Sequence, residues 1–175
     1  MILKGFKEKS NKKYLNKLLS KRQVSVTDSK IESLGIILNI DETDGFEKLR
    51  DLATCLKIRP NKLKIIAFSS SKTNDSNAWE ACFNPKDFGW KGAIKNIDLQ
   101  SFLDIKFDAL VSFYEKDVLE LKTLTAMSKA KFKVGLLQVD ERLNDLIIKT
   151  SINEFNVFKK ELFKYLTILN KIKNE

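Results

Sequence analysis

Residues 107–140 read FDALVSFYEKDVLELKTLTAMSKAKFKVGLLQVD and predict a strand, a helix and a second strand in succession. Ala109–Phe113 and Phe132–Leu137 are short runs rich in apolar and aromatic residues, a pattern typical of buried strands. Between them, apolar and small residues recur at helical spacing, at Val118, Leu121, Leu124, Thr125 and Ser128. Two buried strands joined by a helix form a parallel crossover unit, and its sheet needs cover on both faces.

Residues at the two ends of this helix suit its start and its close turn into the second strand. We expect the helix to begin at Asp117, whose carboxylate accepts backbone N–H groups of the first turn, with Glu120 in the capping-box position. At the other end, Ser128 and Ala130 are small enough to bring the helix close to the sheet, and Gly135 permits close backbone approach. Positive charge near a helix C-terminus is favourable, and it is available from Lys129, Lys131 and Lys133.

A similar strand–helix–strand pattern occurs earlier in the chain. Leu34–Ile40 is a near-continuous apolar run, LGIILNI, and predicts a central buried strand. Apolar residues then recur at helical spacing from Phe46 to Ile58, before Pro60, and Leu63–Phe68 predicts the next strand. We therefore expect an α/β fold of the Rossmann or flavodoxin type: a single three-layer domain with a mainly parallel central sheet, helices on both faces and irregular edge strands.

The remaining segments supply covering helices and edge elements, and no repeat or linker divides residues 1–175. Residues 1–22 predict a basic amphipathic helix, and residues 153–172 predict a final helix capped by Asn153. The polar stretch at 69–81 predicts a loop. The other expected elements are an irregular strand or hairpin at Phe83–Lys95, a short helix at Leu99–Ile105 and a short edge strand at Asp145–Lys149.

Composition excludes several classes of protein and site. The chain has 175 residues, is 43% hydrophobic and can bury a real core. It contains no His, which excludes Ser-His-Asp triads, Cys-His dyads and His-zinc sites within the chain. Cys55 and Cys82 show no repeated spacing, so we expect neither a disulfide nor a metal site. No apolar run suits a membrane span or a secretory signal, so we expect a cytoplasmic protein.

Most of the positive charge belongs to the first helix. The net charge is +9, of which residues 1–22 contribute +7, from eight basic side chains and Glu8. We expect one apolar side on this helix, formed by Leu3, Phe6, Tyr14, Leu15, Leu18 and Leu19. Three roles fit: packing on the domain, contact with nucleic-acid phosphates, and docking on an anionic membrane surface. We favour packing; for the other two roles the candidate residues are Lys9, Lys12, Lys13 and Lys17.

A ligand site is expected beyond the carboxyl ends of the parallel strands, because ligands of open parallel sheets bind there. Polar segments follow the predicted strands at 41–45, 69–74, 114–117 and 138–140. Since these ends share one edge of the sheet, we expect their side chains to converge. The candidate ligand-binding residues are Asp41, Glu42, Ser69, Ser70, Ser71, Lys72, Tyr114, Glu115 and Asp140.

These residues support more than one chemistry. Asp41, Glu42 and Asp44 fit a magnesium ion or a general base, but they equally fit the start of a helix, which we favour. The stretch Ser69–Thr73 offers hydroxyls and Lys72 to a phosphate, but it lacks the glycines of a phosphate-binding loop, which favours a solvated loop. No catalytic residue and no cofactor follows from the sequence.

The segment SKAKFKVG at 128–135, with FDALV at 107–111 before it and DLII at 145–148 after it, resembles a family of small bacterial α/β proteins of unknown function. The likeness extends over the length of the chain and includes its first and last helices. It implies a bacterial cytoplasmic protein with a single α/β domain, and it implies no activity or catalytic residue.

Three functions remain open. The first is a non-catalytic α/β module that binds a protein partner or a small ligand at the carboxyl edge of the sheet. The second is an enzyme that acts there on a nucleotide-like or phosphorylated substrate, using Asp41, Glu42 and Lys72. The third is a protein associated with RNA or a membrane surface through residues 1–22. We rank them in this order, because no motif for nucleophilic catalysis or phosphate binding is present.

Overall fold

The computed structural model describes residues 2–24, 27–71, 82–136 and 140–172. Within these ranges six parallel strands form one sheet in the order β3-β2-β1-β4-β5-β6. The strand order reverses between β1 and β4, as in a Rossmann fold, so the predicted fold class is confirmed. The strands are β1 Leu34–Asn39, β2 Leu63–Phe68, β3 Cys82–Phe83, β4 Ala109–Phe113, β5 Phe132–Leu136 and β6 Leu146–Ile148.

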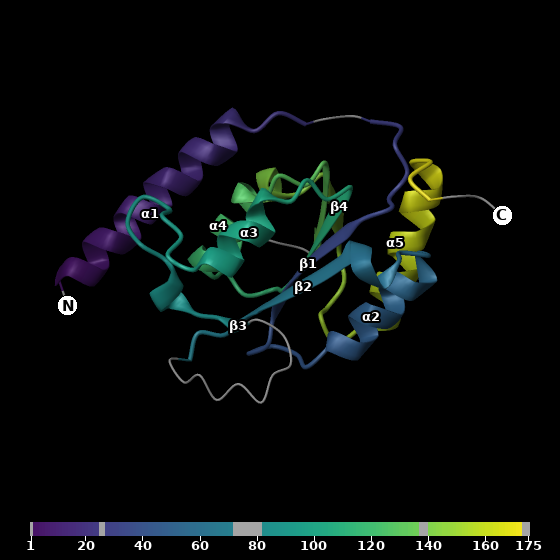
Figure 1. Cartoon of the computed structure of the whole chain (residues 1–175), viewed down its shortest axis with the longest axis horizontal. Helices are drawn as coiled ribbons and strands as arrows, with labels where there is room; N and C mark the ends of the chain where they lie inside the picture. The colour runs from purple at the N-terminus through teal and green to yellow at the C-terminus, as the bar shows by residue number, and fades with distance from the viewer. Residues whose placement is uncertain (1, 25–26, 72–81, 137–139, 173–175) are drawn as a thin grey trace.

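Helices cover both faces of this sheet, as Figure 1 shows. One face packs against α2 and α5, the other against α3 and α4, and α1 lies outside α4. The helices are α1 Ile2–Lys21, α2 Phe46–Cys55, α3 Ile97–Asp104, α4 Leu119–Met127 and α5 Phe155–Ile168, with short 3-10 turns η1 Pro60–Lys62, η2 Pro85–Asp87 and η3 Glu141–Leu143.

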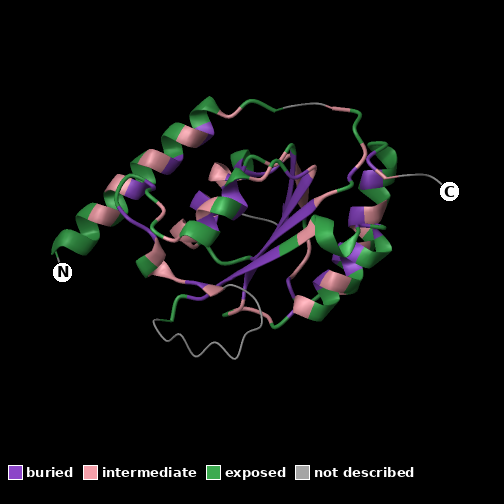
Figure 2. Cartoon of the chain, in the orientation of Figure 1, coloured by how far each residue is buried: buried purple, intermediate pink, exposed green. Residues whose placement is uncertain are grey.

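The core lies on both sides of β1, every residue of which is buried (Figure 2). Leu34, Ile36 and Leu38 pack toward α2 and α5, whereas Ile37 packs toward α3 and α4. Because side chains alternate along a strand, a strand buried on both faces needs apolar residues at nearly every position. This is why the LGIILNI run correctly predicted a central strand.

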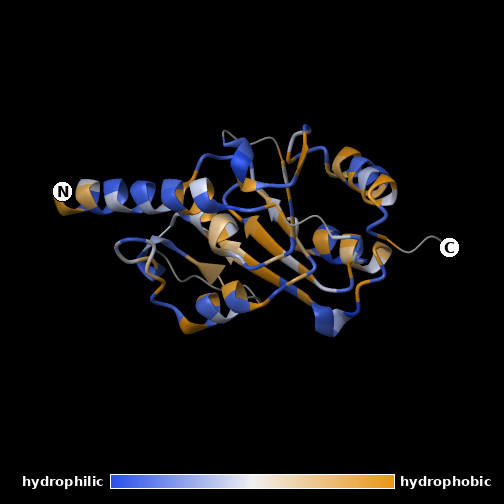
Figure 3. Cartoon of the chain, turned by 90° about the horizontal axis from the view of Figure 1, so that it is seen from above, coloured by the Kyte–Doolittle hydropathy of each residue, from blue (hydrophilic) through white to orange (hydrophobic). Residues whose placement is uncertain are grey.

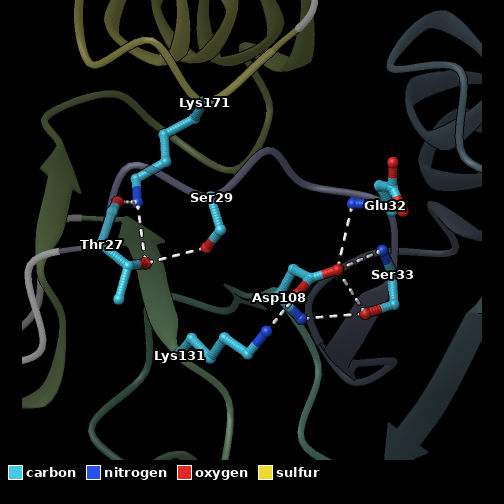
Figure 4. Close-up of polar contacts among 7 residues, drawn as sticks. All are labelled: Thr27, Ser29, Glu32, Ser33, Asp108, Lys131 and Lys171. Atoms are coloured by element: carbon cyan, nitrogen blue, oxygen red, sulfur yellow. Dashed lines mark hydrogen bonds and ion pairs between the residues drawn. The ribbon is translucent and has the colours of Figure 1, made fainter.

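The amino ends of the strands are joined by a cluster around Asp108, shown in Figure 4. One carboxylate oxygen of Asp108 accepts hydrogen bonds from the Glu32 and Ser33 backbone N–H groups at 3.1 and 3.0 Å and from the Ser33 hydroxyl at 2.9 Å. The other oxygen accepts from Lys131 Nζ at 2.8 Å. Burial alone would raise the pKa of Asp108, but the bonds from Lys131 and Ser33 outweigh it and lower that pKa. Asp108 thus aligns the entry to β1 beside β4.

The turn between α4 and β5 has the tight geometry that SKAKFKVG predicted. Lys133 is buried, and its Nζ donates to backbone carbonyls in the last turn of α4. Lys129 and Lys131 instead form ion pairs with Asp104 and Asp108. Gly135 makes room for Asn144, because a Cβ at Gly135 would lie 2.3 Å from Asn144 Nδ2.

Two predicted helix caps are wrong. At the start of α4 the N-cap position is Val118, and Asp117 forms an ion pair with Lys122 instead of accepting backbone N–H groups. At the start of α5 the N-cap position is Glu154 rather than Asn153, and it makes no side-chain cap hydrogen bond. The loops before these helices are held by other carboxylates: Glu42 accepts from the backbone N–H of Lys116, and Glu115 accepts from that of Ile152.

The predicted apolar side of the first helix is also wrong in part. Leu15 and Leu19 are buried against α4 and Leu143, but Leu3 and Phe6 are exposed. Phe6 and Leu15 are nine residues apart, which is about two and a half turns of an α-helix, so they lie on opposite sides. The helix itself is present over Ile2–Lys21.

Candidate functional site

The switch point of the sheet lies between the carboxyl ends of β1 and β4, where a Rossmann protein binds its ligand. Here the carboxylate of Glu42 bridges the two ends. It accepts hydrogen bonds from the backbone N–H groups of Glu115 at 3.2 Å and Lys116 at 3.0 Å, and from Asn39 Nδ2 at 2.7 Å. Backbone N–H groups that would suit a phosphate are therefore satisfied by a side chain of the same protein.

Asp41 joins the carboxyl ends of β1 and β2. Its carboxylate accepts from the Ser69 hydroxyl at 2.6 Å, from the Ser70 backbone N–H at 2.7 Å and from the Ser70 hydroxyl at 2.5 Å. Partial burial raises the pKa of Asp41, but these hydrogen bonds and the charge of Lys116 outweigh it, so the net shift is downward. Ser71 completes the cluster through a 3.0 Å contact with Ser69. The expected convergence at this edge is present, while a ligand role for these residues stays a prediction.

Other candidate residues take part in different contacts. Tyr114 directly follows β4 at this edge, but its side chain is buried in the core, where its hydroxyl is 2.8 Å from Thr125 Oγ1. Glu115 accepts from the backbone N–H of Ile152 at 2.6 Å and holds the loop before α5. Asp140 caps η3 and forms an ion pair with Arg142. Lys72 lies outside the described residues.

The carboxyl edge is thus a network of loops held together by carboxylates. Asp41, Glu42 and Glu115 each accept backbone N–H groups from a neighbouring segment, and this fixes their position. Among the described residues, no group of three or more Cys, Asp or Glu is placed to hold a metal ion. The arrangement stabilises the loops, and it uses carboxylate oxygens of Asp41, Glu42 and Glu115 as acceptors for the main chain.

A second feature, the outer edge of β2, was not anticipated from the sequence. The edge strand β3 pairs only with Ala67 and Phe68, so the stretch Leu63–Ile66 has no strand partner on its outer side among the described residues. A hollow of about 640 Å³ lies along this stretch. Its position depends on how short β3 is, and no local pattern in the sequence predicts that length.

The hollow has two apolar walls, one on each face of the sheet. Ala53 and Ile58 line the side of α2, while Phe83 and Phe102 line the side of α3. Polar residues complete the lining, namely Arg50, Thr54, Lys64, Asp98 and Ser101. Because the sheet edge runs between the walls, an extended chain placed there would direct alternate side chains to the two walls.

The backbone of β2 points hydrogen-bonding groups into this hollow. The N–H of Ser69 bonds to Phe83 of β3, whereas the C=O of Phe68 accepts from Ile40 beyond β1, so alternate residues face opposite neighbours. By this alternation Ile65 directs its N–H and C=O outward. Leu63 also faces outward, but its N–H already bonds to Pro60 within η1.

The basic candidates of the first helix lie on its exposed surface. Lys9, Lys12, Lys13 and Lys17 are all exposed, and Lys12 forms an ion pair with Glu8 at 2.6 Å. No helix in the described ranges is long and apolar enough to cross a bilayer.

Comparison with known proteins gives a family without a function. A search of the curated proteins and a search of the solved structures found no match to this chain. A model described as a family of unknown function, DUF6913, matches residues 7–169. The resemblance to an uncharacterised family is confirmed, whereas bacterial origin and the diagnostic value of SKAKFKVG stay predictions. The match covers most of the sequence, and the chain therefore belongs to the DUF6913 family of unknown function.

Proposed function

We propose that this protein is a non-catalytic binding module that takes up an extended segment of a partner protein at the outer edge of β2. The observation that carries the proposal is the stretch Leu63–Ile66 of β2. Within the described residues it lacks a partner strand on its outer side, and it lies between two apolar walls. Proteins use such edges to bind peptides: main-chain hydrogen bonds supply affinity, and pockets for alternate side chains supply specificity.

The geometry defines the class of partner. Four extended residues span about 13 Å, which matches the stretch of β2 beyond β3. Such a segment would bond to the N–H and C=O of Ile65 and to the C=O of Leu63. Its side chains would alternate between the wall of Ala53 and Ile58 and the wall of Phe83 and Phe102, so the segment needs apolar residues at every second position.

An enzyme at the carboxyl edge is the weaker alternative. The carboxylates that would serve as its general base are bound to backbone N–H groups, and Asp41 is held in its ionised form by Ser69 and Ser70. Cys82 lies nearby, but burial, together with Asp41 and Asp87, raises the pKa of its thiol. A protonated thiol is a weak nucleophile. These contacts favour binding over covalent or acid–base chemistry.

The test compares two sets of peptides of the same composition. In one set apolar residues alternate with polar ones, and in the other the apolar residues recur at helical spacing. Ser101 lines the hollow from an exposed position on α3, so Ser101→Trp fills the groove without entering the core. Thr167→Trp is the matched control on α5, since both hydroxyls donate to the carbonyl four residues earlier at 2.8 Å. Fluorescence anisotropy measures binding, and thermal melts verify folding.

We expect the alternating peptides to bind and the helically spaced set to bind at least about tenfold more weakly. Ser101→Trp should lose binding, and Thr167→Trp should retain it. Equal binding of both peptide sets, or unchanged binding by Ser101→Trp, contradicts the proposal. A concentration-dependent dimer that Ser101→Trp abolishes would assign the edge to a second copy of the chain instead, and light scattering during gel filtration would detect it.

A further inference from the structure

The first half of α1 stands away from the rest of the protein. In Figures 1 and 3 the helix extends past the sheet and its covering helices toward the label N. Its buried residues are Asn11, Leu15 and Leu19, from the middle of the helix onward, whereas residues 2–6 are exposed and green in Figure 2. This half of the helix is held in position by the half that follows it.

The anchor that fixes the helix begins at Asn11. Its side chain donates to the Gly89 carbonyl at 3.0 Å and accepts from the Gly92 backbone N–H at 3.0 Å, and both contacts are buried. Tyr14 lies against Gly92, where a Cβ would come within 2.1 Å of its ring. Gly92 also has a φ of +73°, which favours glycine. The projecting half thus continues from a firmly attached segment.

The projecting half has an apolar side that faces away from the domain. Ile2, Leu3 and Phe6 are 77%, 73% and 59% exposed. Ile2 lies nine residues before Asn11, and Phe6 lies nine before Leu15, so each is about half a turn from the residue that faces the body. These side chains cannot pack on their own domain without rotation of the whole helix.

Lysines continue the same side of the helix. Lys9 and Lys13 follow Phe6 at spacings of three and seven residues, which places them on the stripe of Ile2 and Phe6, and both are exposed. Lys4 and Lys7 precede Asn11 by seven and four residues and therefore lie on the other side of the helix, the side of Asn11. The surface that combines Ile2, Leu3 and Phe6 with Lys9 and Lys13 is called the α1 tip. It offers exposed apolar side chains beside clustered cations.

We infer that the α1 tip docks on an anionic lipid surface. The apolar side chains enter the boundary between head groups and acyl chains, while the lysines lie among anionic head groups. Because the domain lies on the opposite side of the helix, it remains clear of the lipid. RNA phosphates would account for the lysines but would leave Ile2, Leu3 and Phe6 exposed to water without a role. Lipid accounts for both features of the tip.

The test is sedimentation with vesicles of phosphatidylcholine alone and with vesicles containing roughly a quarter phosphatidylglycerol. Leu3→Ser/Phe6→Ser removes the apolar side, and Lys9→Gln/Lys13→Gln removes charge on the same stripe. The controls are Ile168→Ser/Leu169→Ser, 69% and 44% exposed at the end of α5, and Lys86→Gln/Lys160→Gln on other exposed surfaces. Thermal melts should be unchanged for all variants, because every substituted side chain is exposed.

We expect binding only to the anionic vesicles, with about a tenfold loss in affinity for each tip variant and no loss for either control. Binding should weaken at about 1 M salt, where the screening length is roughly 3 Å. Absence of binding to the anionic vesicles overturns the inference. So does binding of a labelled single-stranded RNA that the lysine variant abolishes and the Leu3→Ser/Phe6→Ser variant leaves intact, since that pattern assigns the tip to phosphates.

Discussion

The Nζ atom of Lys133 lies 2.7 Å from the carbonyl oxygen of Thr125, and 3.3 Å from that of Ala126. Both carbonyls belong to the last turn of α4, whose C=O groups have no partner further along the helix. Lys133 comes from β5, so one side chain joins a helix end to a strand of the sheet. Positive charge is favoured at this end of a helix, although burial opposes it.

The pH dependence of stability should reveal this lysine. Burial, with a smaller contribution from Arg22, lowers the pKa of Lys133 from 10.5 to about 8, and Asp145 acts in the opposite direction. Between these two values the unfolded chain binds more protons than the folded one, so stability rises with pH. Measured by urea unfolding, wild type should gain stability relative to Lys133→Met as the pH rises above about 8. A constant difference between the two proteins would contradict this prediction.

Asp41 should also make stability rise with pH, but in the acid range rather than the alkaline one. The bonds from Ser69 and Ser70 hold its pKa below 3.8, so its stabilising effect is present above that value and is lost as the pH falls through the lowered pKa. Since the carboxylate is partly solvated, we expect Asp41→Asn to cost about 1 kcal/mol at neutral pH. The cost should fade in acid, as followed by urea unfolding.

Asp44→Asn is the matched control for Asp41, because Asp44 is exposed in the same loop. It should change stability by no more than about 0.5 kcal/mol at any pH. If Asp44→Asn were as costly as Asp41→Asn, the effect would belong to the charge of the loop rather than to the bonds with the serines.

Two glycines should respond in opposite ways to alanine. At Gly135 a Cβ would lie 2.3 Å from Asn144 Nδ2, so Gly135→Ala should displace that side chain and cost about 1–3 kcal/mol. At Gly5, in the exposed part of α1, a Cβ would meet nothing within 4 Å. There alanine should favour the helix by about 1 kcal/mol. Urea unfolding measures the effect of Gly135→Ala, and the helical signal in far-UV circular dichroism measures that of Gly5→Ala. An unchanged free energy of unfolding in Gly135→Ala would show that Asn144 moves aside freely.

Elements made of continuous apolar runs were predicted with accurate bounds. The strands at Leu63–Phe68 and Ala109–Phe113 match the structure residue for residue, and the central strand ends one residue earlier than expected, at Asn39. Burial on both faces leaves a signal that is local in the chain, because nearly every side chain must then be apolar. The starts of the helices have no comparable local signal. Asp117 is a residue type that commonly caps helices, yet it forms an ion pair with Lys122, five residues further on.

The candidate site was predicted less completely. Chain order alone indicated that Asp41 and the serines after β2 would meet, since parallel strands end at one edge. The burial of Tyr114 was not predicted, because the alternation of the strand continues one residue beyond β4 and carries its ring into the core. The exposed apolar residues of α1 were assigned to the wrong side: Phe6 lies nine residues before Leu15, which is half a turn out of phase with it.

Apolar spacing and chain order were sufficient to predict the fold class, the strands and the edge at which the polar loops gather. The pattern that marks each strand or helix lies within a few neighbouring residues, and the order of these elements along the chain supplies the rest. Only packing decided that Glu42 bonds to Lys116, 74 residues away, that β3 pairs with just two of the six residues of β2, and that α1 departs from the domain before Asn11. Contacts of this kind arise between segments that meet only once the sheet has assembled, so their partners leave no mark on either segment alone.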